Sequence, residues 1–199
     1  MTRARAREAL VAAVLLMASA TSVSAHVQQG QAAGFVTGLR HPVSGLDHVL
    51  AMISVGLWGA QLGAPAVWLL PVTFPMVMAC GAFLGLVGIP LPGVEIGIAL
   101  SAVLLGLMVA GEAKPPLVAA AILVGCFAIF HGHAHGTELP PGQSGLMYSI
   151  GFVAATGCLH GVGIAIGVVH RWTAGRIVLR LAGAAVAIAG LGFLWRAVA

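Results

Sequence analysis

The stretch HPVSGLDHVLAM, residues 41–52, places two histidines and an aspartate directly before a long apolar run. Ionisable groups where a membrane span begins are costly to bury, so they indicate function by default. His41, Asp47 and His48 are good ligands for a borderline divalent cation. The interpretation of the chain therefore depends on whether its other segments supply the second half of a metal site.

The composition is that of an integral membrane protein. The chain has 199 residues, of which 60% are hydrophobic and 7% are charged, and its mean hydropathy is +1.06. A soluble domain carries about 25% charged residues. The formal charge of +4 falls to +2 without the leader described next, because the leader holds three arginines and one glutamate. We therefore expect the lipid bilayer to be the main partner, and no nucleic acid.

Residues 1–25 have the pattern of a cleavable signal peptide. Three arginines precede an apolar core over residues 9–20, and a small-x-small cleavage signal follows over residues 23–25. The alternative is an uncleaved first helix, but the apolar core is shorter than the ~20 residues that a span needs. Cleavage after Ala25 would make His26 the new N-terminus. Its amine and imidazole could chelate a metal ion, although a disordered terminal residue is the simpler interpretation.

Residues 26–199 are expected to form one all-α domain with six transmembrane helices. Residues 26–43 are expected to be a short polar segment, and Ser44 with Asp47 three positions later has the pattern of a capping box. Glycine and proline clusters then separate six apolar segments. Their predicted ranges are 45–62, 66–87, 94–110, 117–135, 145–170 and 176–197.

The second apolar segment contains two prolines, Pro71 and Pro75. Each removes a backbone hydrogen bond, so we expect a kink that exposes the carbonyl groups of Val67 and Pro71. Small residues four positions apart predict close helix packing. The pairs with this spacing are Gly81/Gly85, Gly157/Gly161 and Gly163/Gly167.

The predicted topology brings most of the remaining polar residues to one membrane face. A secretory leader places the mature N-terminus outside, and six spans return the C-terminus to the same side. Lysines and arginines are more frequent in the predicted inner loops than outside, in agreement with the positive-inside rule. The candidate metal ligands at the outer ends of the first, third and fourth spans are His41, Asp47, His48, Glu95, His131, His133, His135 and Glu138.

Imidazole and carboxylate ligands suit Ni²⁺, Co²⁺ and Zn²⁺, whereas Mg²⁺ and Ca²⁺ prefer oxygen ligands alone. Histidine binds metal only when it is neutral, so uptake should weaken at acidic pH. Asp47 could instead only cap its helix, and Glu95 could be a first-turn acid favoured by the helix dipole. His131 and His135 share a helix face at i and i+4, while His133 points elsewhere and is the best candidate for a spectator.

The motifs HPVSGLDHVLAM, TFP, GVE and FHGHAHGTE together resemble those of the HupE/UreJ family of bacterial nickel permeases, over essentially the whole chain. The resemblance implies a secondary, diffusion-facilitator-like transporter that imports Ni²⁺, in some members Co²⁺, across the bacterial inner membrane. It also implies a functional link to the proteins that mature hydrogenase or urease. By motif match, the family's functional positions fall on His41, Asp47, His48, Phe74, Glu95, His135 and Glu138.

The alternative function is a membrane-embedded redox enzyme subunit that binds a metal or a haem. Bis-histidine haem ligation needs paired histidines on separate spans, and only His160 is clearly in mid-span. His160 could instead lie on the ion path or make an interhelical hydrogen bond. We therefore predict a transporter with no catalytic site and no permanently bound cofactor, whose substrate is Ni²⁺ or alternatively Co²⁺ or Zn²⁺. The secondary candidates for metal contact are His131, His160 and His26.

Overall fold

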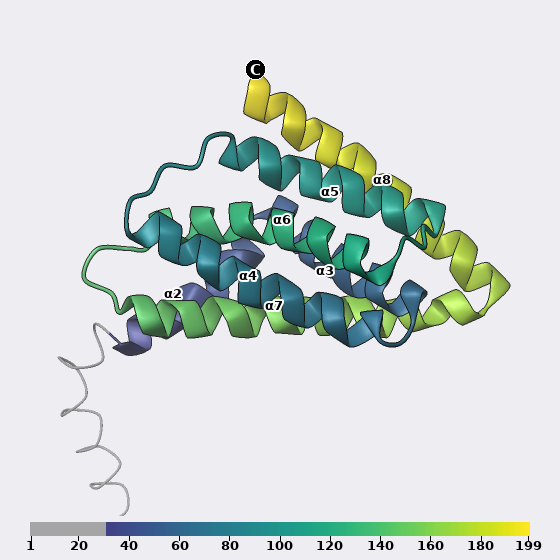
Figure 1. The fold of residues 1–199 in the computed structure, drawn as a ribbon, viewed down its shortest axis with the longest axis horizontal. Helices are drawn as coiled ribbons and strands as arrows, with labels where there is room; N and C mark the ends of the chain where they lie inside the picture. Colours follow the sequence, from purple (N-terminus) through teal and green to yellow (C-terminus); the bar gives the residue numbers. More distant parts are fainter. Residues whose placement is uncertain (1–30) are drawn as a thin grey trace, which may run out of the picture.

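The computed structural model describes residues 31–199 of the chain, which form a bundle of helices (Figure 1). The predicted signal peptide and His26 lie outside the described residues and stay predictions. Within residues 31–199 there is no β-strand, which confirms the all-α class for that part of the chain. The helices are α2 (Gln31–Ser44), α3 (Leu46–Leu62), α4 (Ala66–Leu86), α5 (Val94–Gly111), α6 (Leu117–Thr137), α7 (Gly145–Gly167), the short 3₁₀ helix η1 (Val168–Arg171) and α8 (Thr173–Val198).

Five of these helices, α4 to α8, are long and apolar enough to cross a membrane. Helices α2 and α3 pass the same test only as a pair, and they are bent by 84° at the break between them. The number of candidate spans is therefore five, or six if the bent pair counts as one span. The predicted boundaries of the second to sixth spans agree with α4 to α8 within three residues at each end, because glycine and proline mark most of these ends.

The polar segment predicted before the first span is wrong for residues 31–43, which form most of α2. This helix packs against α7 through glycines. A Cβ atom at Gly38 would lie 2.1 Å from the carbonyl oxygen of Tyr148, and one at Gly151 would lie 2.2 Å from that of Phe35. Such close packing against a neighbour stabilises a helix that its own sequence only weakly favours.

The break between α2 and α3 lies at Gly45, which has an extended backbone (φ −102°, ψ 119°) and is the N-cap residue of α3. The predicted capping box is therefore wrong. Ser44 Oγ donates to the carbonyl oxygen of His41 at 2.6 Å, within the end of α2. Asp47 Oδ1 accepts from the backbone N–H of His48 at 2.8 Å, so it satisfies one free donor of the first turn of α3. The bend places the end of α2 beside the start of α3.

The bundle is built from closely packed helix pairs: α4 with α6, α5 with α8, and both α2 and α3 with α7 (Figure 1). At the contact of α4 with α6, a Cβ atom at Gly132 would lie 1.9 Å from the carbonyl oxygen of Met78. One at Gly85 would lie 2.5 Å from the carbonyl oxygen of His133. Only glycine permits this approach, which fixes the histidine-containing part of α6 against α4.

Close helix packing was predicted at three glycine pairs, and the structure shows it at two of them. The pairs that lie at helix contacts, as predicted, are Gly81/Gly85 and Gly163/Gly167. Cβ atoms at Gly157 and Gly161 would meet no heavy atom within 4 Å, so the prediction of close packing is wrong there. At about 100° per residue, these two glycines lie on the face of α7 that turns away from α3. Spacing alone therefore did not distinguish a packed face from an open one.

The two ends of the bundle carry different polar groups. Glu95 lies in the first turn of α5 and Glu112 directly follows its last residue, so the two acids are at opposite ends. Glu112 accepts two hydrogen bonds from Arg176 of α8, at 3.1 and 2.7 Å. The arginine end is defined here by Glu112, Arg176 and Arg180. The histidine end is defined by His41, Asp47, His48, Glu95, His131, His135 and Glu138.

Candidate metal site

The bend between α2 and α3 assembles the histidine end from segments that are distant in sequence. His41 lies in the last turn of α2, and Asp47 lies in the first turn of α3 with His48 beside it. His135 lies in the last turn of α6, and Glu138 is its C-cap residue. Side chains from both sequence motifs therefore meet at one end of the bundle, as the predicted topology required.

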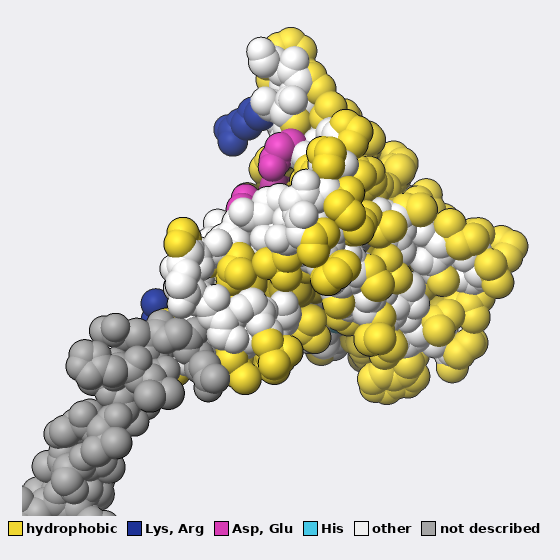
Figure 2. Space-filling view, turned by 60° about the vertical axis from the view of Figure 1, so that its left-hand side comes forward, with side chains coloured by type: hydrophobic (Ala, Val, Ile, Leu, Met, Phe, Trp, Pro, Cys, Tyr) yellow, Lys and Arg dark blue, Asp and Glu magenta, His cyan; other side chains and the backbone are white. Residues whose placement is uncertain are grey.

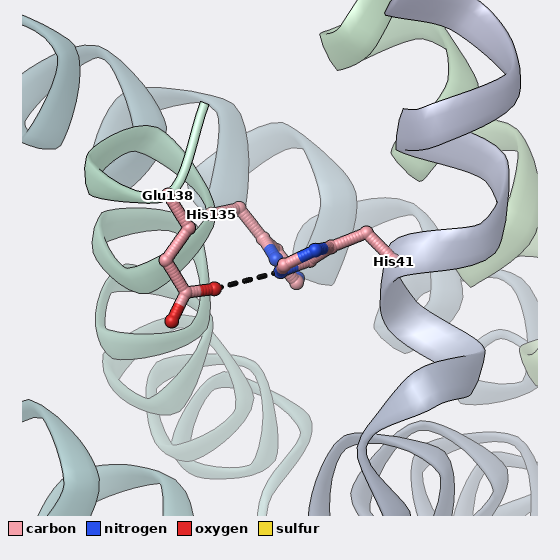
Figure 3. A group of neighbouring side chains, drawn as sticks. All are labelled: His41, His135 and Glu138. Carbon is pink, nitrogen blue, oxygen red and sulfur yellow. Dashed lines mark ion pairs between the residues drawn. The ribbon is translucent and has the colours of Figure 1, made fainter. Parts of the chain in front are cut away.

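Three side chains lie close enough to share one metal ion: His41, His135 and Glu138 (Figure 3). One ligand atom from each lies within 4.8 Å of the other two. His41 Nε2 is 2.7 Å from Glu138 Oε2, and the rings of His41 and His135 meet edge to face with centroids 4.8 Å apart. Since Zn²⁺ is bound by such atoms at about 2.0–2.2 Å, a shift of roughly 1 Å or less would let all three ligate one ion.

Further imidazoles lie directly behind this group. The ring of His48 is 4.9 Å from that of His131 and 5.0 Å from that of His135, between centroids. His48 Nδ1 is 2.9 Å from Asp47 Oδ1. A neutral His48 that donates from Nδ1 to Asp47 carries its lone pair on Nε2. Carboxylates orient metal-binding histidines in this way at many metal sites, so Asp47 can act without touching the ion itself.

Several of these ring nitrogens are buried with no hydrogen-bond partner among the described residues. They are His48 Nε2, His131 Nε2 and both ring nitrogens of His135. His131 Nδ1 is 3.0 Å from the carbonyl oxygen of Phe127, so a neutral His131 donates there and keeps its lone pair on Nε2. Buried polar atoms are nearly always paired. Unpaired nitrogens gathered in one place therefore indicate a ligand that they are arranged to hold.

Glu138 supplies negative charge to this group of side chains, here called the histidine cluster and made of His41, His48, His131, His135 and Glu138. The hydrogen bond from His41 holds the pKa of the Glu138 carboxyl below its ordinary value, because that bond stabilises the ionised form. Partial burial raises the pKa but is the smaller effect. Glu138 is therefore ionised at neutral pH. Together with the imidazoles it offers the mixed oxygen and nitrogen ligands that suit Ni²⁺, Co²⁺ and Zn²⁺.

Two cavities border the cluster. The first has a volume of about 380 Å³ and is lined by His41, Ser44, Gly45, Asp47, His48, Glu95, Ala134 and Glu138. The second has a volume of about 450 Å³ and is lined by Leu46, Asp47, Glu95, Ala99, Phe193, Arg196 and Ala197. Asp47 and Glu95 line both cavities, so the acid predicted on α5 lies beside the histidine cluster. Figure 2 shows acidic side chains gathered near a basic one on this face.

The remaining sequence-predicted residues lie at different depths. His133 Nε2 is 2.8 Å from the carbonyl oxygen of Ile89, so this histidine faces the loop between α4 and α5 and not the cluster. Phe74 is fully buried in α4. Its ring centroid lies 5.3 Å from that of His131 and 5.3 Å from that of His160. Phe74 and His160 are therefore continuous with the cluster but lie beneath it.

Sequence reasoning missed three residues that border the site. The ring of Phe152 stacks on His135 with centroids 5.1 Å apart, and that of Tyr148 meets His41 at 5.8 Å. Tyr148 is the sole tyrosine of the chain, and it lies four residues before Phe152, on the same helix face. This spacing could have indicated from the sequence that the two aromatic rings lie together on one face of α7. Arg196, which lines the larger cavity, lies near the end of an apolar helix and carries no motif.

Comparisons with known proteins find matches that extend over most of the chain. The sequence matches the family described as "HupE / UreJ protein" over residues 13–193. The curated Protein HupE of Rhizobium leguminosarum bv. viciae is 50% identical over 180 residues, which is 90% of this chain and 94% of the relative. No solved structure matches the chain significantly. Together with the apolar helices, the family match identifies a multi-pass membrane protein.

Proposed function

The chain belongs to the HupE / UreJ family, and on that premise we propose that it is a secondary permease importing Ni²⁺, or Co²⁺, across the bacterial inner membrane. The metal would supply hydrogenase or urease assembly. The observation that carries the proposal is the group of His41, His135 and Glu138, whose ligand atoms lie within 4.8 Å of one another at the rim of a cavity. The alternative of a haem-binding redox subunit has no comparable observation among the described residues.

The orientation of the proposed permease places the histidine end in the periplasm. Basic residues support this orientation because they favour the cytoplasmic side. The basic residues at the opposite end, where α5 ends and α8 begins, include Lys114 in the loop after α5, Arg171 in η1 and Arg176 near the start of α8. With this orientation the C-terminus, at the end of α8, is periplasmic. The mature N-terminus is expected on the same side.

The proposed site would capture the ion and then release it. Asp47 and Glu95 border both cavities, so their negative charge would attract a hydrated cation. Glu138 and the neighbouring imidazoles would replace some of the water molecules around the ion. A permeating ion must also leave, so binding has to be moderate. The hydrogen bond between His41 and Glu138 would have to open before both groups could ligate, which limits the affinity.

The proposal is tested by uptake of radioactive Ni²⁺ into nickel-starved cells that express the wild type or one of two histidine variants at equal membrane abundance. We expect His135→Gln to lower the initial rate at least about tenfold, because even the loss of a residue that only orients a metal ligand costs about 10–100-fold at other sites. His133→Gln is the matched control, since it changes the same residue type on the same helix but outside the cluster. We expect it to transport like the wild type.

Two results would overturn the proposal. Equal uptake by the two variants would show that the cluster does not carry the ion. Absence of Ni²⁺ and Co²⁺ uptake by the wild type above an empty-vector control would refute the permease itself. A coloured purified protein would in that case favour the haem-binding alternative.

A further inference from the structure

A second, deeper group of polar atoms lies beyond the cluster, around His160 of α7. This histidine is 1% exposed, and it lies fifteen residues after the first residue of α7. At a rise of about 1.5 Å per residue, its backbone is roughly 22 Å along the helix from that end. Its ring contacts Phe74, which also contacts His131 of the cluster. Phe74 therefore connects the two groups.

The prolines of α4 determine which nitrogen of His160 is free. Pro75 has no backbone N–H, so the carbonyl oxygen of Pro71 lacks the donor that a helix would supply four residues later. His160 Nδ1 lies 3.3 Å from this oxygen and can donate to it only when the proton is on Nδ1. A neutral His160 held in this way carries its lone pair on Nε2. The carbonyl that the sequence predicted to be exposed thus orients an imidazole from another helix.

Nothing among the described residues satisfies that lone pair. His160 Nε2 is buried and has no hydrogen-bond partner. Thr156, one turn earlier on the same face of α7, is fully buried and its hydroxyl is also unpaired. Buried polar groups are nearly always hydrogen-bonded, so two unpaired ones a single turn apart on α7 require an explanation.

We propose that His160 is an inner ligand on the ion path, which receives the divalent cation through Nε2 after it leaves the histidine cluster past Phe74. The inference rests on the proposed transport function and goes beyond it, because it adds a second site. No carboxylate touches His160 among the described contacts, whereas the histidine end has three acids, Asp47, Glu95 and Glu138. The inner site would therefore hold the ion more weakly than the cluster, as forward movement requires.

The test must separate a metal ligand from a hydrogen-bonding residue that only joins α7 to α4. His160→Gln keeps a donor for the Pro71 carbonyl but removes the imidazole. His160→Cys keeps a good ligand for Ni²⁺ but removes the strong donor. A ligand role predicts that the Cys variant transports faster than the Gln variant, and a purely structural role predicts the reverse.

His170→Gln is the matched control. His170 Nδ1 also bonds a backbone carbonyl, that of Gly167 at 2.8 Å, but this residue lies in η1 and away from the cluster. Initial rates of Ni²⁺ uptake are measured at equal membrane abundance, and Ni²⁺ binding is measured on the purified full-length proteins. We expect His160→Gln to reduce uptake at least about tenfold while its affinity for Ni²⁺ at the cluster stays that of the wild type. His170→Gln should match the wild type in both.

Each other outcome overturns the inner site. Wild-type uptake by His160→Gln would refute it and leave the permease intact. A Gln variant that transports faster than the Cys variant, or failure of both to accumulate in the membrane, would assign His160 a structural role. Absence of uptake by the wild type would refute the permease and the inner site together.

Discussion

Both the histidine end and the arginine end of the bundle contain carboxylates, but the partner of the carboxylate is an imidazole at the first and a guanidinium at the second. At the arginine end, Glu112 accepts from the guanidinium of Arg176 at 2.7 and 3.1 Å. This hydrogen bonding lowers the pKa of Glu112. At the histidine end, Glu138 and Asp47 pair with imidazoles at 2.7 and 2.9 Å. The geometry is similar at the two ends, and the chemistry is not.

The difference lies in what the partner can do next. A guanidinium is always charged and has no lone pair, so it neutralises a carboxylate and excludes a cation. A neutral imidazole has a lone pair and can join the carboxylate in binding a cation. A Glu–Arg pair therefore offers no ligand to a metal ion, whereas a Glu–His pair offers a carboxylate oxygen and an imidazole nitrogen. Under the proposed function, the partner and not the acid distinguishes the end that binds metal from the end that does not.

The largest effect is expected from Asp47→Asn. Asparagine keeps the oxygen that accepts from the His48 backbone N–H, but it removes the charge that borders both cavities and orients the His48 ring. We expect Ni²⁺ uptake to fall by about 10–100-fold at unchanged membrane abundance. Unchanged uptake would return Asp47 to a helix-capping role and would weaken the contrast between the two ends.

A smaller, structural effect is expected where α6 is fixed against α4. In Gly132→Ala the new Cβ would lie 1.9 Å from the carbonyl oxygen of Met78, so the helices must separate. Overpacking of this kind costs about 1–3 kcal/mol, which should lower the thermal midpoint of the purified protein. Gly157→Ala is the control, because its Cβ meets nothing within 4 Å. Equal midpoints for both variants would contradict the packing described for the histidine end.

Pro75→Ala should produce a moderate loss of transport. Alanine restores the backbone N–H that the Pro71 carbonyl lacks, so the carbonyl would bond within α4 and compete with His160. We expect uptake to slow severalfold with little loss of stability, since alanine also favours helix. Uptake equal to that of the wild type would show that the proline only shapes α4.

The smallest effect is expected at the arginine end. Glu112→Gln removes the ion pair with Arg176 but leaves an amide that can accept one of its hydrogen bonds. We expect a thermal midpoint slightly below that of the wild type and uptake within error of it. The contribution of this pair to stability should be present at neutral pH and lost as the pH falls through the lowered pKa of Glu112. A loss of uptake as large as that of Asp47→Asn would remove the distinction between the ends.

The apolar helices were predicted well from the sequence. Glycine and proline mark their ends, and the residues between these ends are apolar enough for a membrane span. The sequence also predicted that His41, His135 and Glu138 lie at one end of the bundle, since residues of the ligand types are few and the order of the helices brings them together.

The sequence did not predict α2, whose stability depends on Gly38 and Gly151 meeting α7. It misassigned Ser44 for a related reason, since the break falls one residue later, at Gly45. Which face of a helix packs, and where a bend falls, depends on partners that local patterns do not specify.

The contacts of the residues beneath the cluster could not be predicted from the sequence either. Pro71 was expected to expose a carbonyl, but the imidazole that meets it comes from residue 160, on a different helix. Phe74 had a family-implied role without a physical reason until its contacts with His131 and His160 were known. Contacts between spans so far apart in sequence follow from helix packing.

The most direct test of the central claim is calorimetric titration of the purified protein with Ni²⁺, comparing the wild type, Glu138→Gln and Glu112→Gln. The two substitutions make the same chemical change at opposite ends of the bundle. We predict that Glu138→Gln raises the dissociation constant for Ni²⁺ at least about tenfold, while Glu112→Gln leaves it unchanged. Equal dissociation constants for all three proteins, or a larger effect of Glu112→Gln, would contradict a metal site at the histidine end.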